Sequence, residues 1–432
     1  MLPFNPLATR VRWVLVFWIF VMSAIAYLDR VNISIAGRAI ANEFHLSDVQ
    51  LGAVFSAFVL GYAFGQAPAG WLADKIGPRR ILLLGAIWWA VFTTLITALS
   101  PALGSLLWIV IVIRFSLGAG EAVVYPASNC IVASWIPSAE RGIANGIIFS
   151  GVGLGSGITS PLITFLMTHY GWRASFWCSA ALGLIGGAIW YFVARNTPQQ
   201  HPWVGAEERQ YIDSGILKDA SAGKAKLPWA SIVTNRDILI ITFSYFTYGY
   251  AAYIFFSWFF IYLNEVRHLN LRQSSLYTSL PFLAMTAGSL LGGWVSDRMT
   301  IKFGKRMGRC GIAVVGIALS AVFIAIGSQV QSAQLASLVL AGGAGALYLS
   351  QSSFWSISAD IGGRSAGSVS GFMNAGGQLG GALTVWLTPV IAHRSGWTAS
   401  FLVAAGLCIC GALAWLLVNP ERVPAKQTVS HP

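Results

Sequence analysis

Twelve stretches of the chain are apolar over enough residues to cross a lipid bilayer as helices. The hydrocarbon core is about 30 Å thick and needs about 20 apolar residues per helix. Only 10% of the 432 residues are charged, whereas a soluble domain averages about 25%. This composition cannot cover a water-facing surface, which excludes an ordinary soluble enzyme, a secreted disulfide scaffold and a disordered chain. We therefore predict an all-α membrane protein with spans near 13–35, 49–73, 81–99, 105–130, 141–166, 173–195, 238–263, 273–297, 309–328, 334–357, 366–391 and 397–418.

Two short segments recur at nearly the same offset. GWRASF at 171–176 returns as GWTASF at 396–401, an offset of 225, and GWLAD at 70–74 returns as GWVSD at 293–297, an offset of 223. Chance in a chain rich in Gly and Trp does not easily produce two matches at one offset. We predict two six-helix halves in the same orientation, namely an N-terminal six-helix bundle at 1–195, a cytoplasmic linker at 196–237 and a C-terminal six-helix bundle at 238–432.

The net charge of +12 is explained by topology. Of the 27 Lys and Arg residues, 20 fall on the side that holds both termini and the linker, and 5 fall on the opposite side. Basic residues accumulate in cytoplasmic loops. We therefore expect both termini in the cytoplasm of a multi-pass protein of a cell inner (plasma) membrane, in contact with the lipid bilayer, and the charge requires no nucleic acid as a partner.

The sequence carries no pattern for a metal, a cofactor or a catalytic centre. The five cysteines lie in apolar runs, and no two of the six histidines have metal-ligand spacing. No H-E-x-x-H motif occurs, and no G-x-S-x-G motif lies within a predicted span,. We expect neither enzyme activity nor a cofactor.

A conspicuous motif, Gly70-Trp-Leu-Ala-Asp74-Lys-Ile-Gly77-Pro-Arg79-Arg80, lies between spans 2 and 3. It resembles the loop motif of the major facilitator superfamily, and its second copy, beginning at Asp297 and Arg298, is degenerate. The resemblance covers essentially the whole chain. It implies two bundles that rock about a central site, with these residues acting as a latch that stabilises the outward-facing state.

Four charged residues lie inside predicted spans and away from their ends: Asp29, Arg30, Arg114 and Glu121. Each costs at least about 2.5 kcal/mol at the bilayer centre, so each is a functional candidate. Their charges sum to zero, so a purely structural pairing, such as Asp29 with Arg114, is an open alternative. Against that alternative, the same span and several others carry surplus polar side chains that a helix facing only lipid would not need: Tyr27, Tyr62, Gln66, Gln351, Ser352, Trp355, Asn374 and Gln378.

These residues strengthen the resemblance. Tyr27-x-Asp29-Arg30, Tyr62 with Gln66, Arg114 with Glu121, Trp355 and Asn374 are similar to motifs of the anion:cation symporter family. That family includes bacterial sugar-acid and other carboxylate transporters, and animal relatives that carry glutamate, sialic acid and phosphate. The family often has a polar residue such as Gln in span 5, where this chain has SGVGLGS at 150–156. We expect a smaller or less hydroxylated substrate for that reason.

The resulting hypothesis is proton-coupled uptake of an organic anion by alternating access, in a monomer. Arg30 and Arg114 would attract a carboxylate, and Asp29 and Glu121 would carry protons, since burial favours the uncharged form of a carboxyl group. The remaining substrate contacts would come from Tyr27, Tyr62, Ser352, Trp355, Asn374 and Gln378. A proton-coupled exporter or antiporter, and a membrane sensor built on the same scaffold, are the alternatives. Paired arginines favour anionic cargo over the first alternative, and the short tails argue against the second.

Overall fold

The computed structural model describes residues 10–101, 104–217 and 227–420, and within these ranges it contains helices and no strand. Residues 218–226 of the predicted linker, with their lysines, and the predicted cytoplasmic residues Arg422 and Lys426 lie outside the described residues. The first half contains α1 (Val11–Phe44), α2 (Asp48–Ile76), α3 (Pro78–Thr97), α4 (Leu106–Glu121), α5 (Val124–Trp135), the short η1 (Ser138–Glu140), α6 (Arg141–Tyr170) and α7 (Trp172–Val193).

The second half repeats this plan with more interruptions. It contains α10 (Arg236–Ser257), α11 (Phe259–Ile261), the π-helix η3 (Tyr262–Val266), α12 (Leu271–Lys305), the π-helix η4 (Arg306–Gly311), α13 (Ile312–Gln329), α14 (Ala333–Leu349), α15 (Gln351–Gly362), η5 (Gly363–Ser365), α16 (Ala366–Ser395) and α17 (Trp397–Trp415).

Twelve spans are present, as predicted. Ten continuous helical stretches among the described residues are long and apolar enough to cross a membrane. Two of them, Leu276–Gln329 and Ala333–Ser395, each contain two of the predicted spans. Several helices run beyond the predicted bounds, because polar residues at helix ends can lie in the interfacial region outside the hydrocarbon core.

The sequence repeat is also visible in the backbone. Gly171 ends α6 with φ of +80°, and Gly396 ends α16 with φ of +85°. A side chain at this backbone angle would clash with the preceding peptide, so glycine allows the tight reversal into α7 and α17. The same turn is therefore built twice from the same residue.

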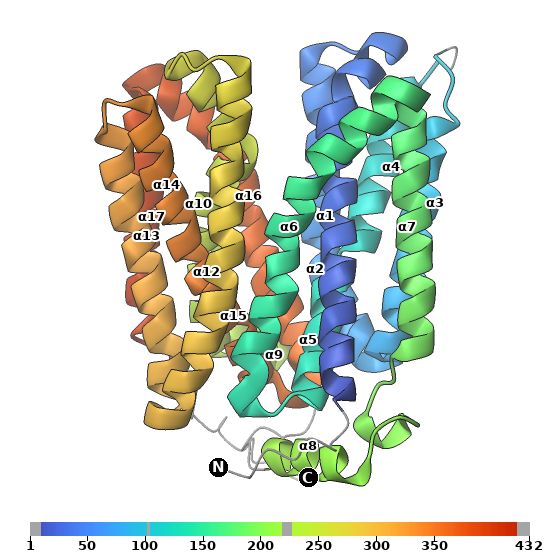
Figure 1. Cartoon of the computed structure of the whole chain (residues 1–432), viewed down its shortest axis with the longest axis vertical. Helices are drawn as coiled ribbons and strands as arrows, with labels where there is room; N and C mark the ends of the chain where they lie inside the picture. The colour runs from blue at the N-terminus through green and yellow to red at the C-terminus, as the bar shows by residue number, and fades with distance from the viewer. Residues whose placement is uncertain (1–9, 102–103, 218–226, 421–432) are drawn as a thin grey trace, which may run out of the picture.

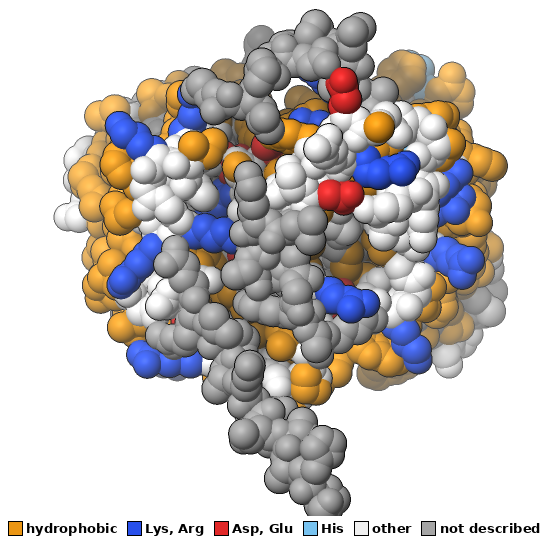
Figure 2. Space-filling model, turned by 90° about the horizontal axis from the view of Figure 1, so that it is seen from below, with side chains coloured by type: hydrophobic (Ala, Val, Ile, Leu, Met, Phe, Trp, Pro, Cys, Tyr) orange, Lys and Arg blue, Asp and Glu red, His pale blue; other side chains and the backbone are white. Residues whose placement is uncertain are grey.

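Figure 1 shows α1–α7 and α10–α17 as two groups of helices, which we call the N-terminal and C-terminal bundles. The bundles diverge toward the end away from α8 (Ala206–Leu217). We call the end that holds α8 and the start of α1 the linker end. Lys and Arg side chains surround the face at this end, as Figure 2 shows, with few acidic ones among them. This distribution is the one expected from the basic loops of the sequence.

The bundles touch mainly where α2 packs on α16 and α6 packs on α12. A Cβ atom on Gly70 would lie 2.1 Å from the carbonyl oxygen of Gly367, and one on Gly142 would lie 2.6 Å from that of Gly293. Side chains larger than hydrogen would force these helices apart. Small residues therefore permit the close approach of the two bundles at the linker end.

The linker, with η2 (Pro198–Gln200), α8 and α9 (Trp229–Thr234) among its described residues, is fixed to the N-terminal bundle. The carboxylate of Glu208 in α8 accepts the backbone N–H groups of Val11 and Arg12 at 3.0 and 3.2 Å. A negative charge at the start of α1 is favoured by the helix dipole.

His201 lies buried between this linker and α7. Its Nε2–H donates to the carbonyl of Val193 at 2.8 Å, and its Nδ1 accepts the N–H of Trp203 at 3.1 Å. Both nitrogens are used by the neutral ring, and burial lowers the pKa of His201. A proton added at Nδ1 would break the bond to Trp203.

Candidate functional site

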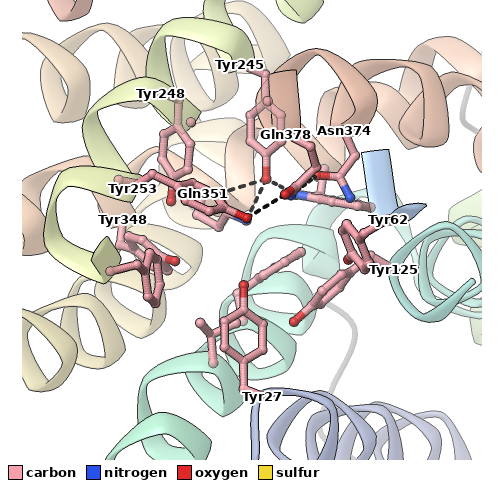
Figure 3. Close-up of a pocket in the computed structure, with 17 residues that line it drawn as sticks. Tyr27, Tyr62, Tyr125, Tyr245, Tyr248, Tyr253, Tyr348, Gln351, Asn374 and Gln378 are labelled. Carbon is pink, nitrogen blue, oxygen red and sulfur yellow. Dashed lines mark hydrogen bonds between the residues drawn. The ribbon is translucent and has the colours of Figure 1, made fainter. Parts of the chain in front are cut away.

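A cavity lies between the two bundles and is lined from both of them. The volume open to the centres of water molecules in this cavity is about 40 Å³. This is enough room for about three waters. Figure 3 shows Tyr27 and Tyr125 facing Tyr245, Gln351 and Gln378 across it. The lining residues are Tyr27, Tyr62, Tyr125, Phe149, Val152, Tyr245, Tyr248, Gly249, Ala252, Tyr253, Phe256, Tyr348, Gln351, Trp355, Asn374, Gly377 and Gln378.

Hydrogen bonds fix the C-terminal wall of this cavity. The Tyr245 hydroxyl in α10 accepts from Gln351 Nε2 at 3.0 Å and from Trp355 Nε1 at 3.2 Å. The Tyr253 hydroxyl donates to Gln378 Oε1 at 2.6 Å. A network of this kind holds aromatic and amide groups in one arrangement without any charged member.

A second network crosses between the bundles. Asn374 in α16 donates from Nδ2 to Gln66 Oε1 in α2 at 2.8 Å. Gln378, one helical turn further along α16, donates to Asn374 Oδ1 at 3.4 Å. Asn374 and Gln378, four residues apart, therefore share one face of α16, and that face meets the opposite bundle.

The charged residues of the predicted site lie behind the N-terminal wall. Arg30 Nη2 in α1 donates to Glu121 Oε1 in α4 at 2.8 Å. The Arg30 guanidinium lies 4.6 Å from the ring centre of Tyr27 and 4.3 Å from that of Tyr62. Both of these tyrosines line the cavity. Two aromatic faces thus separate the Arg30 charge from the cavity and stabilise it by cation–π attraction.

Asp29 and Arg114 complete this cluster. Both are buried, and Asp29 accepts a hydrogen bond from the Thr93 hydroxyl at 3.2 Å. The Arg114 guanidinium lies 4.7 Å from the ring centre of Phe58, and that of Arg30 lies 5.3 Å from the same ring. The two cations therefore flank one aromatic side chain.

This cluster is incompletely paired. Among the described residues, Asp29 Oδ1, Glu121 Oε2, Arg30 Nε and Arg114 Nε are buried without a hydrogen-bond partner. A buried polar atom without a partner costs free energy that a purely structural ion pair would avoid. The two carboxyl oxygens are positions that could take a proton, and the two guanidinium N–H groups are positions that could donate to an anion. No group of three or more metal-ligating side chains occurs within the described ranges.

Five of the predicted binding residues line the cavity, and three do not. Tyr27, Tyr62, Trp355, Asn374 and Gln378 line it. Arg30 and Arg114 lie in the cluster behind it. Ser352 is fully buried but is not part of the lining, and its hydroxyl has no partner among the described residues.

Five tyrosines of the lining were not predicted: Tyr125, Tyr245, Tyr248, Tyr253 and Tyr348. The spacing of tyrosines 245, 248 and 253 in span 7 could have indicated a cavity-facing side of that helix. Intervals of three and eight residues bring side chains to one face of a helix. Aromatic residues in an apolar span are ordinarily read as lipid-facing or core residues, and these three did not stand out.

Asp74 lies across the bundle interface at the linker end. Its carboxylate accepts the backbone N–H groups of Gly367 and Ser368 at 3.0 and 2.8 Å, the Ser368 hydroxyl at 2.5 Å and the Cys130 thiol at 3.2 Å. Gly367 and Ser368 form the first turn of α16. An acid of the N-terminal bundle thus caps a helix of the C-terminal bundle.

Asp297 makes the reciprocal contact. It accepts the N–H groups of Gly142 and Ile143 in the first turn of α6 at 2.8 and 2.6 Å. Arg309 Nη1 lies 2.7 Å from its Oδ1. The second copy of the motif, although degenerate in sequence, therefore builds the same helix cap with the roles of the bundles exchanged.

The basic residues of the motif act within their own bundle. Gly77 begins α3 with φ of +94°. Arg79 Nε donates to the carbonyl of Tyr191 in α7 at 2.8 Å, and Arg80 lies beside it at the same helix start. Arg298 lies 5.5 Å from the ring centre of Trp294, and the cation that contacts Asp297 is Arg309. The latch role of these residues stays a prediction.

One further pair crosses the interface near this end. Arg141 Nη1 at the start of α6 forms a buried salt bridge with Asp360 Oδ1 in α15. Lys305 Nζ lies 3.6 Å from the other oxygen of Asp360. The pair was not predicted, because Arg141 was counted only as one of the 20 basic residues expected on the cytoplasmic side.

Two bundles of six spans around a central cavity, joined by polar caps at one end, define a multi-pass membrane transport protein. The comparisons agree on its family. The chain belongs to the Major Facilitator Superfamily, whose family model matches residues 19–385 and, in a second match, 302–431. A solved proton:xylose symporter of this superfamily, bound to 6-bromo-6-deoxy-D-glucose, has the same fold, with a TM-score of 0.74 over 94% of this chain and 96% of that one at 14% identity.

Relatives in sequence cover nearly the whole chain. It is 36% identical to a probable sulfoacetate transporter of Cupriavidus necator, over 92% of each chain. It is 32% identical to a probable galactarate/D-glucarate transporter of Bacillus subtilis, over 98% of this chain and 96% of the relative. An ascorbate transporter of Arabidopsis thaliana chloroplasts is also 32% identical, over 95% and 76%. Family and relatives indicate a transporter and not an enzyme, as the sequence predicts.

Proposed function

We propose that this protein takes up a small organic anion together with protons across a bacterial inner membrane, with the linker end in the cytoplasm. Sulfoacetate, galactarate, glucarate and ascorbate, named for its relatives, all bear a negative charge at neutral pH. The substrate class that they share is a small carboxylate, sulfonate or other acid, and a sugar acid is the principal candidate.

The observation that carries the proposal is the partly buried Arg30–Glu121 pair behind Tyr27 and Tyr62. Arg30 is one aromatic ring away from a cavity that both bundles line. A guanidinium binds a carboxylate or sulfonate through parallel N–H donors. In this structure the Arg30 guanidinium is paired with Glu121. A substrate anion that binds Arg30 must therefore replace Glu121.

Proton coupling follows from this competition. When Glu121 is ionised, it neutralises Arg30 and leaves little attraction for a second anion. When Glu121 is protonated, the Arg30 cation lacks its partner and an anion can bind. Asp29 and Arg114 would repeat the exchange beside it. The carrier then reorients most easily with proton and anion both bound, since unpaired charge in a low-dielectric interior is costly.

Replacement of Glu121 tests the proton step. Glu121→Gln should abolish uptake driven by a pH gradient in proteoliposomes, while exchange of labelled for unlabelled anion continues, because exchange needs no net proton movement. Uptake would be measured with sulfoacetate and D-gluconate. Glu43→Gln is the matched control, since Glu43 pairs with Arg173 at the opposite end of the same bundle. Gradient-driven uptake at the wild-type rate in Glu121→Gln would remove Glu121 from the proton pathway.

Replacement of Arg114 tests the anion site. Arg114→Ala should lose binding of the same anions by at least about tenfold, the scale of one charge-assisted hydrogen bond. Arg114→Lys retains the charge and should retain part of the binding even if the alanine variant is poorly folded. Arg173→Ala serves as a control outside the cavity. Unchanged affinity in a folded Arg114→Ala protein would exclude Arg114 from the site.

A further inference from the structure

The positive charge near the cavity lies on one side only. Arg30 and Arg114 belong to α1 and α4 of the N-terminal bundle and flank the ring of Phe58. Among the described residues, the lining contributed by the C-terminal bundle contains no Lys or Arg. Arg309, the buried arginine among the described side chains of that bundle, contacts Asp297 at the linker end. A substrate that spans the cavity therefore meets cations at one end and none at the other.

From this asymmetry we propose that the substrate carries all of its charge at one end. The carrier accepts monoanions and compact dianions, and it rejects acids whose two charged groups lie at opposite ends of an extended or rigid body. The inference rests on the proposed function, because it assigns the substrate class of the same site.

The C-terminal wall offers little to a second carboxylate. The amide of Gln351 and the indole N–H of Trp355 are bonded to Tyr245, and Gln378 is bonded to Tyr253 and Asn374. Much of the remaining surface consists of tyrosine rings. The face of an aromatic ring carries negative electrostatic potential, which attracts cations and repels anions. This wall suits hydroxyl groups or an uncharged apolar end.

The N-terminal side can accept two charges that are close together. Arg30 and Arg114 contact the same ring, so both guanidiniums serve one region when Asp29 and Glu121 are protonated. Sulfoacetate, the anion named for one relative, carries its sulfonate and carboxylate on a single carbon. Such a compact dianion could meet both arginines without reaching the opposite wall.

Two matched comparisons test the charge distribution. D-Gluconate and D-glucarate share a six-carbon polyol chain and differ by one carboxylate at the far end. Sulfoacetate and 4-sulfobenzoate carry the same two acid groups, close together in the first and held apart by a ring in the second. Binding to the purified full-length protein at pH 7 would be measured by isothermal titration calorimetry.

We expect the first member of each pair to bind at least about tenfold more tightly, because a buried ionised group without a partner costs at least this much. Equal or tighter binding of D-glucarate or of 4-sulfobenzoate would overturn the inference and leave the proposed function intact. Absence of binding by all four anions would count against the proposed function itself, so the two failures are distinguishable.

A change of one residue should weaken or cancel the preference. Gln378→Lys adds a cation to the C-terminal wall and should improve binding of D-glucarate relative to D-gluconate by about tenfold or more. Gln329→Lys is the matched control, since Gln329 ends α13 and is exposed away from the cavity. An unchanged D-glucarate to D-gluconate ratio in a folded Gln378→Lys protein would contradict the inference.

Discussion

The cap that Asp74 places on α16 should set how often the linker end opens. Opening separates α2 from α16 and breaks the contacts of the Asp74 carboxylate with Gly367 and Ser368. Asp74→Asn preserves the shape of the side chain and one acceptor oxygen but removes the negative charge. The closed state should lose stabilisation relative to the open state, in which the carboxylate is solvated.

The magnitude follows from the bonds lost. A charged side chain at a helix N-terminus stabilises by up to about 2 kcal/mol in a partly buried position, and one hydrogen bond to a charged group contributes about 1.5–3 kcal/mol. Because asparagine retains one acceptor, we expect a loss of about 1.5–2 kcal/mol. That loss raises the open fraction about 10- to 30-fold, as long as the closed state remains the major one.

The assay uses a buried position at the interface. Ser356 in α15 is fully buried and accepts a hydrogen bond from Asn145 of the opposite bundle at 3.2 Å. In a variant without the five native cysteines, Ser356→Cys should react with a maleimide only when the linker end opens. The reaction rate should rise about 10- to 30-fold on Asp74→Asn.

Two further variants sharpen this test. Asp297→Asn should have a similar effect because Asp297 makes the reciprocal cap, and Glu43→Gln should have none because its ion pair lies within one bundle. A labelling rate that changes less than about twofold in a folded Asp74→Asn protein would refute the reasoning. A twofold change corresponds to a loss of only about 0.4 kcal/mol, well below the expected value.

Two other predictions concern packing and pH. Gly70→Ala should hold the linker end open and stop uptake, because its Cβ would lie 2.1 Å from a carbonyl oxygen of α16. Gly52→Ala in the same helix is the control, since its Cβ would meet nothing within 4 Å. The maleimide reaction of Ser356→Cys would be measured in both variants, and a wild-type rate in Gly70→Ala would contradict the close approach of the helices. The neutral, buried His201 has a folded-state pKa below its ordinary value of about 6.5,, so below that pH the unfolded state binds a proton that the folded state excludes and stability falls. His201→Asn should flatten this part of the pH dependence of the melting temperature between pH 5 and 7.5, and an unchanged slope would show that His201 does not cause it.

The fold was largely predictable because the bilayer simplifies the problem. In lipid, each backbone polar group must be satisfied within a helix, so apolar length alone identifies spans. The repeat at 171–176 and 396–401 then showed two equivalent halves. Interruptions inside spans, such as the break between α4 and α5 and the break between α10 and α11, leave the hydropathy of a span unchanged and were not predicted.

The site was predictable only in part. Ionisable residues such as Arg30 and Glu121 were evident because any charge in a span is exceptional. The tyrosines at 245, 248 and 253 were not, because lipid and protein interior are similarly apolar, and hydropathy does not indicate which face of a helix meets the other bundle. The partner of Asp297 was also hidden, since Arg309 lies 12 residues further along. The two meet because the chain bends at Gly304 near the end of α12, where φ is +84°.

Tyr27 touches both the charge cluster and the opposite bundle. Its ring centre lies 4.6 Å from the Arg30 guanidinium and 6.1 Å from the ring centre of Phe256 in α10. An anion that draws Arg30 away from Glu121 must therefore disturb the same ring that bridges the two halves. Cargo recognition and movement of the halves would share one side chain, and a proton arriving without cargo would leave that bridge in its resting position. Under the proposed proton coupling, such an arrangement would limit futile leakage of protons across the membrane.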